Sequence, residues 1–194
     1  MESLNLYLSD ELLLAKGGER LCYLHPYDPT KVIKITSKKR VNRSQNKLDD
    51  VYHRYLMKSK KNLDQVTECF GFVETNLGKG LVFTRVLDYN GEASYSLEDV
   101  INKKLVPIEH QRQLLRELMT YLSENQILFV DIGCSNIFCQ QLSEHQYRFV
   151  IVDGLGARRL NYKYWLYVYI GFYRRFKIKK QSIKMIDNHE RRIS

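Results

Sequence analysis

The stretch from residue 127 to residue 153 constrains this chain more than any other feature. It contains three apolar runs separated by polar residues, and these are Ile127–Val130, Ile137–Cys139 and Phe149–Val152. Short apolar runs of this kind predict three short strands, of which the last two form a hairpin. The hairpin would return the chain, so that Asp153 lies close to Asn136. Together with Asp131, we therefore expect two carboxylates and one carboxamide to converge at one edge of a small sheet.

These three side chains predict a site for a hard cation. Oxygen ligands suit Mg²⁺, and so few of them leave room for water and phosphate oxygens. The spacing narrows the prediction, because Asn136 follows Asp131 by five residues and a hairpin then leads to Asp153-Gly154. This order resembles the Asp-x-x-x-x-Asn catalytic loop and the Asp-Phe-Gly motif of the protein-kinase fold.

The composition is that of a folded protein. At 194 residues and 44% hydrophobic content, the chain can build one compact unit or two small lobes. Glu2, Asp10 and Glu11 interrupt its start, so we expect no signal peptide and a cytoplasmic location. The four cysteines lack Cys-x-x-Cys spacing and a His at metal-site distance, which predicts reduced, mostly buried thiols. They are Cys22, Cys69, Cys134 and Cys139.

The net charge of +9 is concentrated in two segments. Residues 31–61 carry 11 Lys/Arg against two Asp, and residues 158–194 carry 11 Lys/Arg against one Asp and one Glu. Each segment therefore has a net charge of +9, and the rest of the chain sums to −9. Such a segment can face nucleic acid, anionic lipid or a phosphorylated ligand. A solvated helix face that aids solubility explains it equally well.

The first 86 residues predict an antiparallel sheet with one helix. Five strands are expected near residues 3–14, 21–24, 31–35, 69–73 and 81–84. The turn between the first two contains Gly17-Gly18, where we expect positive φ or a close approach to another group. Helical spacing over residues 42–58 predicts a helix with one apolar face. That face consists of Leu48, Tyr52, Tyr55 and Leu56.

The second half predicts helices around the hairpin. Ser96 suits the N-cap of a helix at 97–101, and Pro107 begins a strongly amphipathic helix that ends near Asn125. Residues 164–173 are uncharged and aromatic but too short for a bilayer, which takes about 20 apolar residues. They form either a helix packed under the hairpin or an interfacial helix at an anionic membrane surface, peripheral at the inner membrane. From Gln181 onward the pattern predicts a frayed or disordered end.

Nearly the whole chain resembles the YrbL family of bacterial proteins, the PhoP regulatory-network proteins of the protein-kinase-like superfamily. The resemblance rests on the glycine turn and on four later motifs. These are Lys-Val-Ile-Lys-Ile at 31–35, Glu-Asn-Gln-Ile at 124–127, Asn-Ile-Phe-Cys at 136–139 and Val-Asp-Gly at 152–154. It implies an α+β, minimal two-lobed kinase-like fold in a single catalytic domain. A five-stranded N-lobe at 1–86 would precede a mostly helical C-lobe at 87–194.

The resemblance also implies roles for the residues around the hairpin. Asp131 would orient the attacking hydroxyl and accept its proton. Asn136 and Asp153 would hold Mg²⁺, so the expected cofactors are ATP and Mg²⁺. Catalysis would then consist of positioning and charge neutralisation.

The N-lobe residues receive nucleotide-binding roles from the same resemblance. Lys34 would fix the α and β phosphates as a point charge, and Gly17 and Gly18 would lie over the phosphates. Asp49 is the expected acidic partner of Lys34, with Asp50 as the alternative. An exposed acid within a basic helix explains Asp49 about as well.

Three departures from the kinase pattern affect the expected activity. Phe129-Val130 stands where kinases commonly have His-Arg, and Asp153-Gly154 lacks the intervening Phe. Gly133 stands where serine/threonine kinases carry a lysine near the γ-phosphate. Losing that charge predicts a slow enzyme, unless the basic segment at 31–61 or an arginine at 158–159 replaces it.

Two hypotheses about function follow. In the first, the protein transfers the γ-phosphate of ATP to a hydroxyl of a protein, a lipopolysaccharide or a small molecule. In the second, it is a pseudokinase that binds nucleotide as a regulatory module. The basic segments, with Tyr and Phe available for stacking, allow a third class, but we do not expect nucleic acid as the partner.

Overall fold

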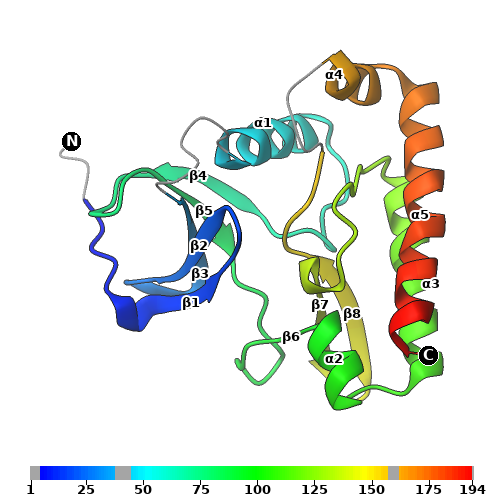
Figure 1. The fold of residues 1–194 in the computed structure, drawn as a ribbon, viewed down its shortest axis with the longest axis horizontal. Coiled ribbons are helices and arrows are strands. Elements are labelled where there is room, and N and C mark those ends of the chain that lie inside the picture. The colour runs from blue at the N-terminus through cyan, green and yellow to red at the C-terminus, as the bar shows by residue number, and fades with distance from the viewer. Residues whose placement is uncertain (1–4, 38–44, 157–161, 194) are drawn as a thin grey trace. The chain divides into compact units, whose positions relative to one another are not determined.

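A computed structural model of the protein describes residues 5–37, 45–156 and 162–193. The chain folds as two compact units. The first unit comprises Met1–Lys58 and Thr67–Arg85, and the second comprises Ser59–Val66 and Val86–Ser194. The first unit holds the larger sheet and helix α1, and the second holds the smaller sheet and the other α-helices (Figure 1).

The first unit is built on the predicted five-stranded antiparallel sheet, whose strand order is β1-β2-β3-β5-β4. Its strands are β1 (Leu13–Lys16), β2 (Arg20–His25), β3 (Asp28–Thr36), β4 (Cys69–Val73) and β5 (Gly80–Thr84). The prediction of strand over residues 3–14 is mostly wrong, because β1 begins only at Leu13. Residues Asp10–Leu12 form a 3-10 turn, and Leu6 makes only an isolated bridge to Thr75.

The sheet has two different faces because side chains alternate along β3. Ile33 and Ile35 point to the face that packs against Tyr23, Val82 and the buried leucines Leu6 and Leu8. Val32 lies with Leu81 and Phe83 in a separate apolar cluster on the other face. Lys34, two residues after Val32, shares that second face. The sheet therefore places one lysine among apolar neighbours.

Helix α1 (Gln45–Lys58) lies on the face of the sheet that carries Lys34. Its His53 ring meets the Phe83 ring edge-on at 5.4 Å between centroids, and Asn46 Nδ2 donates to the Lys34 carbonyl oxygen at 2.7 Å. Of the predicted apolar face, Tyr52 and Leu56 are buried, whereas Leu48 and Tyr55 are only partly so. The expected start of this helix at Asn42 lies outside the described residues.

The second unit combines an antiparallel three-stranded sheet, order β6-β7-β8, with four α-helices. The strands are β6 (Tyr95–Ser96), β7 (Ile137–Ser143) and β8 (Gln146–Ile151). The helices are α2 (Leu97–Lys103), α3 (Ile108–Glu124), α4 (Tyr162–Tyr169) and α5 (Gly171–Ile193). The predicted N-cap is confirmed, because the Ser96 side chain accepts from the Asp99 backbone N–H at 3.1 Å.

The β7–β8 hairpin confirms the return of the chain, with Ile137 paired opposite Ile151. The first apolar run, Ile127–Val130, is not a strand. It is a buried connection that makes one isolated bridge, between Phe129 and Leu155. The run is apolar because it passes through the core of the second unit, and this burial produces the same sequence signal as a short buried strand.

The C-terminal segment differs from two predictions. The helix expected at 164–173 is a junction, since α4 ends at Tyr169 and α5 starts at Gly171. Residues from Gln181 onward are helical to Ile193 rather than frayed, and α5 runs alongside α3 (Figure 1). Buried side chains recur at helical spacing along α5, and they are Ile178, Gln181, Met185 and His189. No helix in the described part of the chain is long and apolar enough to cross a bilayer.

Two side-chain pairs join α5 to α3. Arg112 binds both carboxylate oxygens of Glu190, at 2.9 and 2.7 Å. His189 Nε2 lies 3.0 Å from Gln111 Oε1, and both residues are buried. Half of the buried residues on this face of α5 are polar. The spacing of apolar residues alone therefore does not reveal the helix. That is why the sequence predicted a frayed end.

Candidate active site

The Asp131 segment and the Asp153-Gly154 turn lie side by side in the second unit. The backbone N–H groups of Val130 and Asp131 both donate to the Gly154 carbonyl oxygen, at 2.8 and 3.0 Å. Gly154 has φ of +83°, and a Cβ there would lie 2.8 Å from the Cβ and the carbonyl oxygen of Asp131. Both the backbone conformation and the available space therefore require glycine at this position.

Asn136 is held between the same two segments. Its Nδ2 donates to the Asp131 carbonyl oxygen at 2.8 Å, and its own carbonyl accepts from the Val152 N–H at 3.0 Å. A short 3-10 turn, Cys134–Asn136, makes the first contact possible. The side-chain amide therefore uses its nitrogen on the protein, and its Oδ1 remains the atom suited to a cation.

Asp153 completes a group of three oxygen-bearing side chains. Its Oδ1 accepts from the Gly154 N–H at 2.7 Å, which fixes the carboxylate at the end of the hairpin. The structure thus brings together Asp131, Asn136 and Asp153, as the hairpin predicted. Among described residues no cluster of three His, Cys, Asp or Glu side chains could hold a metal ion. A Mg²⁺ ion at this position would have one carboxylate, one carboxamide and otherwise water or phosphate as ligands.

In the first unit, Lys34 is buried on β3. Its Nζ lies 4.4 Å from the centroid of the Phe83 ring, a cation–π contact with a residue of β5. The Asn46 side chain holds the Lys34 backbone from α1. A lysine in this position is anchored by β-branched neighbours while its ammonium lies on the α1 side of the sheet.

Asp49 lies on the face of α1 that meets the sheet, and its carboxylate binds Arg20. Arg20 Nη1 is 2.5 Å from Asp49 Oδ2 and 3.2 Å from Asn46 Oδ1, and Gln45 Nε2 donates to Asp49 Oδ1 at 3.2 Å. The alternative acid, Asp50, binds Arg54 one turn along the helix. Pairing of Lys34 with either acid stays a prediction.

Sequence reasoning did not single out Arg20, although a signal was present. Arg20 begins β2 two residues before Cys22, and Cys22 lies opposite Lys34 in the sheet. Residues two apart on a strand share a face. Arg20 and Lys34 therefore had to lie on the same face of the sheet.

The glycine turn differs from one expectation. Neither Gly17 nor Gly18 has positive φ. Gly17 donates its N–H to the Arg20 carbonyl at 2.8 Å, and a Cβ on Gly17 would lie 3.2 Å from that oxygen, whereas Gly18 has open space around its Cα. A close approach to the backbone thus explains Gly17, and the phosphate-binding role of both glycines remains a prediction.

The cysteines are all free thiols, as predicted. Burial raises the pKa of the Cys139 thiol to about 12, and burial also raises the pKa values of Cys69 and Cys134. Thiols with raised pKa values carry little thiolate at neutral pH, so none of these three is suited to act as a nucleophile.

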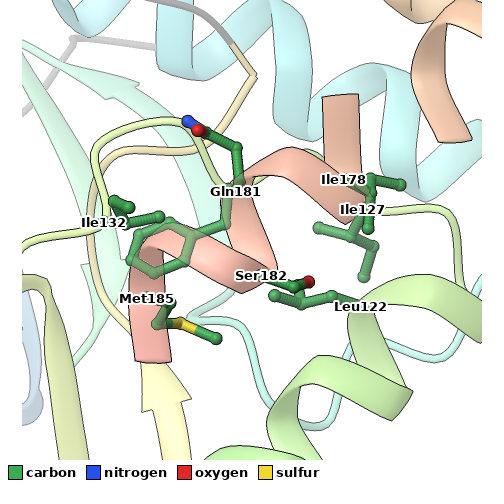
Figure 2. Close-up of a pocket in the computed structure, with 8 residues that line it drawn as sticks. Leu122, Ile127, Ile132, Ile178, Gln181, Ser182 and Met185 are labelled. Carbon is green, nitrogen blue, oxygen red and sulfur yellow. The ribbon is translucent and has the colours of Figure 1, made fainter. Parts of the chain in front are cut away.

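A small, mainly apolar pocket lies beneath the Asp131 segment (Figure 2). Leu122 at the end of α3, Ile127 and Ile132 face Ile178 and Met185 of α5 across it. At its edge the α5 side chain of Gln181 donates to the Val130 carbonyl at 2.8 Å, directly before Asp131. Helix α5 therefore helps to hold the backbone of the candidate site directly before Asp131.

The class of protein follows from these features. An antiparallel five-stranded sheet with one helix, followed by an Asp-x-x-x-x-Asn loop, a hairpin and Asp-Gly on a helical unit, defines a protein-kinase-like fold. The chain belongs to the family described as PhoP regulatory network protein YrbL, whose model matches residues 6–190. This confirms the family resemblance read from the sequence.

Relatives and solved structures agree with this assignment. The chain is 30% identical over 161 residues to protein YrbL of Escherichia coli (strain K12) and to that of Shigella flexneri. Each alignment covers 79% of this chain and 74% of the relative. A crystal structure of Rad53 in complex with AMP-PNP matches with a TM-score of 0.54 and 20% identity, over 78% of this chain and 39% of that one. The PknI kinase domain of Mycobacterium tuberculosis matches with a TM-score of 0.51 and 12% identity, over 73% and 56%.

Proposed function

We propose that the protein is an ATP- and Mg²⁺-dependent phosphotransferase that transfers the γ-phosphate to a hydroxyl group. One observation carries the proposal: Asn136 Nδ2 and the Gly154 carbonyl both bind the Asp131 backbone, so the two acids and the amide are held as one group. The AMP-PNP named for the Rad53 structure supports a nucleotide as the ligand of this fold.

Each residue then has a definite task. Asp131 accepts the proton of the attacking hydroxyl, and its exposed position suits contact with an acceptor. Asn136 Oδ1 and the Asp153 carboxylate would hold Mg²⁺, which neutralises charge on the phosphates when it is bound. In the first unit, Lys34 binds the α and β phosphates. The acceptor is a hydroxyl of a protein, a lipopolysaccharide or a small molecule.

A pseudokinase is the second candidate, favoured by Gly133. A glycine at this position supplies no cation to the γ-phosphate, and transition-state charge stabilisation is usually a large part of the rate. Such a protein would bind nucleotide and serve as a regulatory module without turnover. Both candidates bind nucleotide, but only the phosphotransferase releases ADP, by transferring the γ-phosphate to an acceptor hydroxyl or, without an acceptor, to water.

Binding is tested by thermal unfolding with and without Mg-ATP. A ligand at about 100 times its Kd stabilises the folded state by about 2.7 kcal/mol, so the wild-type Tm is expected to rise by several degrees. Asp153→Ala should lose most of this rise, because it removes the carboxylate that would hold Mg²⁺. Asp64→Ala, at an exposed position of the second unit, is the matched control and should keep the full rise.

Three outcomes separate the candidates. An equal rise in wild type and Asp153→Ala contradicts the metal role of Asp153. No rise in the wild type, with Mg²⁺ or with EDTA, contradicts both the phosphotransferase and the nucleotide-binding module. A rise without ADP release supports the module alone.

Gly133 offers a test of the missing charge. Its backbone is extended, with φ of −76° and ψ of 144°, and a Cβ would meet only Ser135 Oγ at 3.5 Å and Asn136 Nδ2 at 3.7 Å. A side chain therefore fits, and Gly133→Lys is expected to raise ADP release by about tenfold or more. Gly133→Met, which has a long uncharged side chain, should leave the rate unchanged. Equal rates in the two variants would show that charge at this position does not limit turnover.

A further inference from the structure

The corner between α4 and α5 exposes a group of aromatic side chains. Trp165 and Tyr169 of α4 and Phe172, Tyr173 and Phe176 of α5 are each between 45% and 76% exposed, and we call them the aromatic corner. Trp165 stacks on Tyr169 at 5.6 Å between ring centroids, and Phe172 meets Tyr173 edge-on at 5.8 Å. The two rings of each pair contact one another, and all five side chains still leave much of their area in water. Contiguous exposed apolar patches usually mark an interaction site.

Helix α5 extends the apolar surface along a second face. Its buried face, described above, packs toward α3 and the Asp131 segment. Successive residues turn by about 100° around a helix, which places Phe172, Phe176 and Ile183 on the side opposite the buried face, with Ile186 at the flank. All four are exposed. A surface helix of a globular protein normally has one apolar stripe, so the second stripe requires its own explanation.

The same segment is strongly basic and contains no acid. Residues 162–186 hold seven Lys/Arg and no Asp or Glu. Four exposed cations of α5 lie within or beside the second apolar stripe, and they are Arg175, Lys179, Lys180 and Lys184. We call these four the basic strip. One exposed acid of α5, Asp187, follows Lys184 by one turn, so the surface that contains the aromatic corner combines large apolar side chains with a net positive charge.

We propose that the aromatic corner and the basic strip dock on the surface of an anionic phospholipid bilayer, with α5 lying in the plane of the interface. Tyr and Trp favour the headgroup region, where the ring is in an apolar layer and the polar tip is in water. Lys and Arg are attracted to anionic headgroups, and the apolar stripe enters the boundary with the acyl chains. The charges on α5 are compatible with this position and incompatible with crossing the membrane.

Charge and shape favour the bilayer over other occupants. A second copy of this helix would place mainly like charges opposite one another, because α5 carries eight Lys/Arg against Asp187 and Glu190. Nucleic acid would satisfy the basic strip, but Ile183 and Ile186 have no ring on which a base could stack. A soluble phosphorylated ligand would leave the apolar stripe in water. The proposal is independent of phosphotransfer, because no residue of the candidate active site takes part in it.

The sequence provides its own probe, because Trp165 is the only tryptophan of the chain. The full-length protein is titrated with vesicles of phosphatidylcholine alone and with vesicles containing one quarter phosphatidylglycerol. With the anionic vesicles, Trp165 emission should shift to shorter wavelength as the ring leaves water. Partitioning should be at least tenfold stronger than with phosphatidylcholine alone, and it should weaken as salt is raised.

Two double variants test the two parts of the surface. Phe172→Ser/Phe176→Ser and Lys179→Glu/Lys180→Glu should each weaken partitioning at least tenfold. Their Tm values should match the wild type, since all four side chains are exposed. Lys16→Glu/Lys58→Glu makes the same change in net charge at exposed positions of the first unit, and it should bind vesicles like the wild type.

Several results would overturn the proposal. These are an unchanged Trp165 emission with anionic vesicles, equal partitioning to both vesicle types, and equal weakening by Lys16→Glu/Lys58→Glu. If inorganic phosphate or glycerol phosphate alone produced the shift, the surface would bind a soluble anion instead. A shift that depends only on protein concentration would indicate self-association, and one produced by an oligonucleotide without vesicle binding would indicate nucleic acid.

Discussion

Replacing Asp131 with asparagine should lower the rate of ADP release from Mg-ATP by about 10²- to 10⁴-fold, the usual contribution of a positioned general base. The substitution keeps the size of the side chain and removes its ability to accept a proton. The contacts that organise the site use the Asp131 backbone, namely its N–H on Gly154 and its carbonyl on Asn136. These backbone contacts should remain in Asp131→Asn. The lower rate of ADP release would then come from the missing proton acceptor and not from a change in the local fold.

Thermal unfolding separates chemistry from binding in this variant. Asp131→Asn should keep the Tm rise with Mg-ATP, whereas Asp153→Ala should lose it. Asp64→Asn makes the same chemical change at an exposed position and should keep both turnover and stabilisation. If Asp131→Asn turns over at the wild-type rate, Asp131 is not the base. If the wild type itself releases no ADP above the uncatalysed background, the phosphotransferase hypothesis fails and nucleotide binding has to be judged by Tm alone.

Removing the Asp49 carboxylate should lower the free energy of unfolding by about 3–5 kcal/mol, because Asp49→Ala takes away the carboxylate that binds the buried guanidinium of Arg20. The side chains of Arg20 and Asp49 are only 9% and 5% exposed, and their charged atoms lie 2.5 Å apart. At this buried site, the desolvation of the Arg20 guanidinium accounts for most of the expected loss of stability. Denaturant unfolding followed by circular dichroism measures the loss.

Asp50 on the same helix provides the matched comparison. Its partner Arg54 is 65% exposed and one turn away, so water can replace the carboxylate there, and Asp50→Ala should cost clearly less than Asp49→Ala. Arg20→Met/Asp49→Leu removes both charges and should be more stable than Asp49→Ala, since it leaves no buried charge unpaired. Equal costs for Asp49→Ala and Asp50→Ala, or a double variant no more stable than Asp49→Ala, would contradict this account.

The local geometry of the candidate site followed from the sequence. An Asp, an Asn five residues later and a hairpin that ends in Asp-Gly leave the chain few ways to place Asp131, Asn136 and Asp153 other than together. The N-cap at Ser96 and the helix that begins after Pro107 could also be predicted from the sequence, because capping depends on neighbouring residues alone. The roles of these side chains in phosphotransfer, and that of Lys34 in nucleotide binding, stay predictions.

Other parts of the structure could not be predicted from the sequence. Ile127–Val130 has the apolar pattern of a strand and is a buried connection, since burial produces that pattern in either conformation. Gln181 and His189 are polar, and the sequence predicts a frayed or disordered end from Gln181 onward. They are nevertheless buried, because Gln181 binds the carbonyl of Val130 and His189 binds Gln111 of α3.

The sequence by itself determined the kinase-like fold class, the hairpin and the residues that meet at its base, since each depends on spacing within a short stretch of chain. Only the tertiary structure decided that Arg20 binds Asp49, that α5 supports the Asp131 segment, and that the aromatic corner remains exposed. The physical reason is that burial and pairing of polar side chains depend on residues distant in the sequence. The sequence pattern of a lysine-rich helix with aromatic residues does not distinguish rings that face the core from rings that face the solvent.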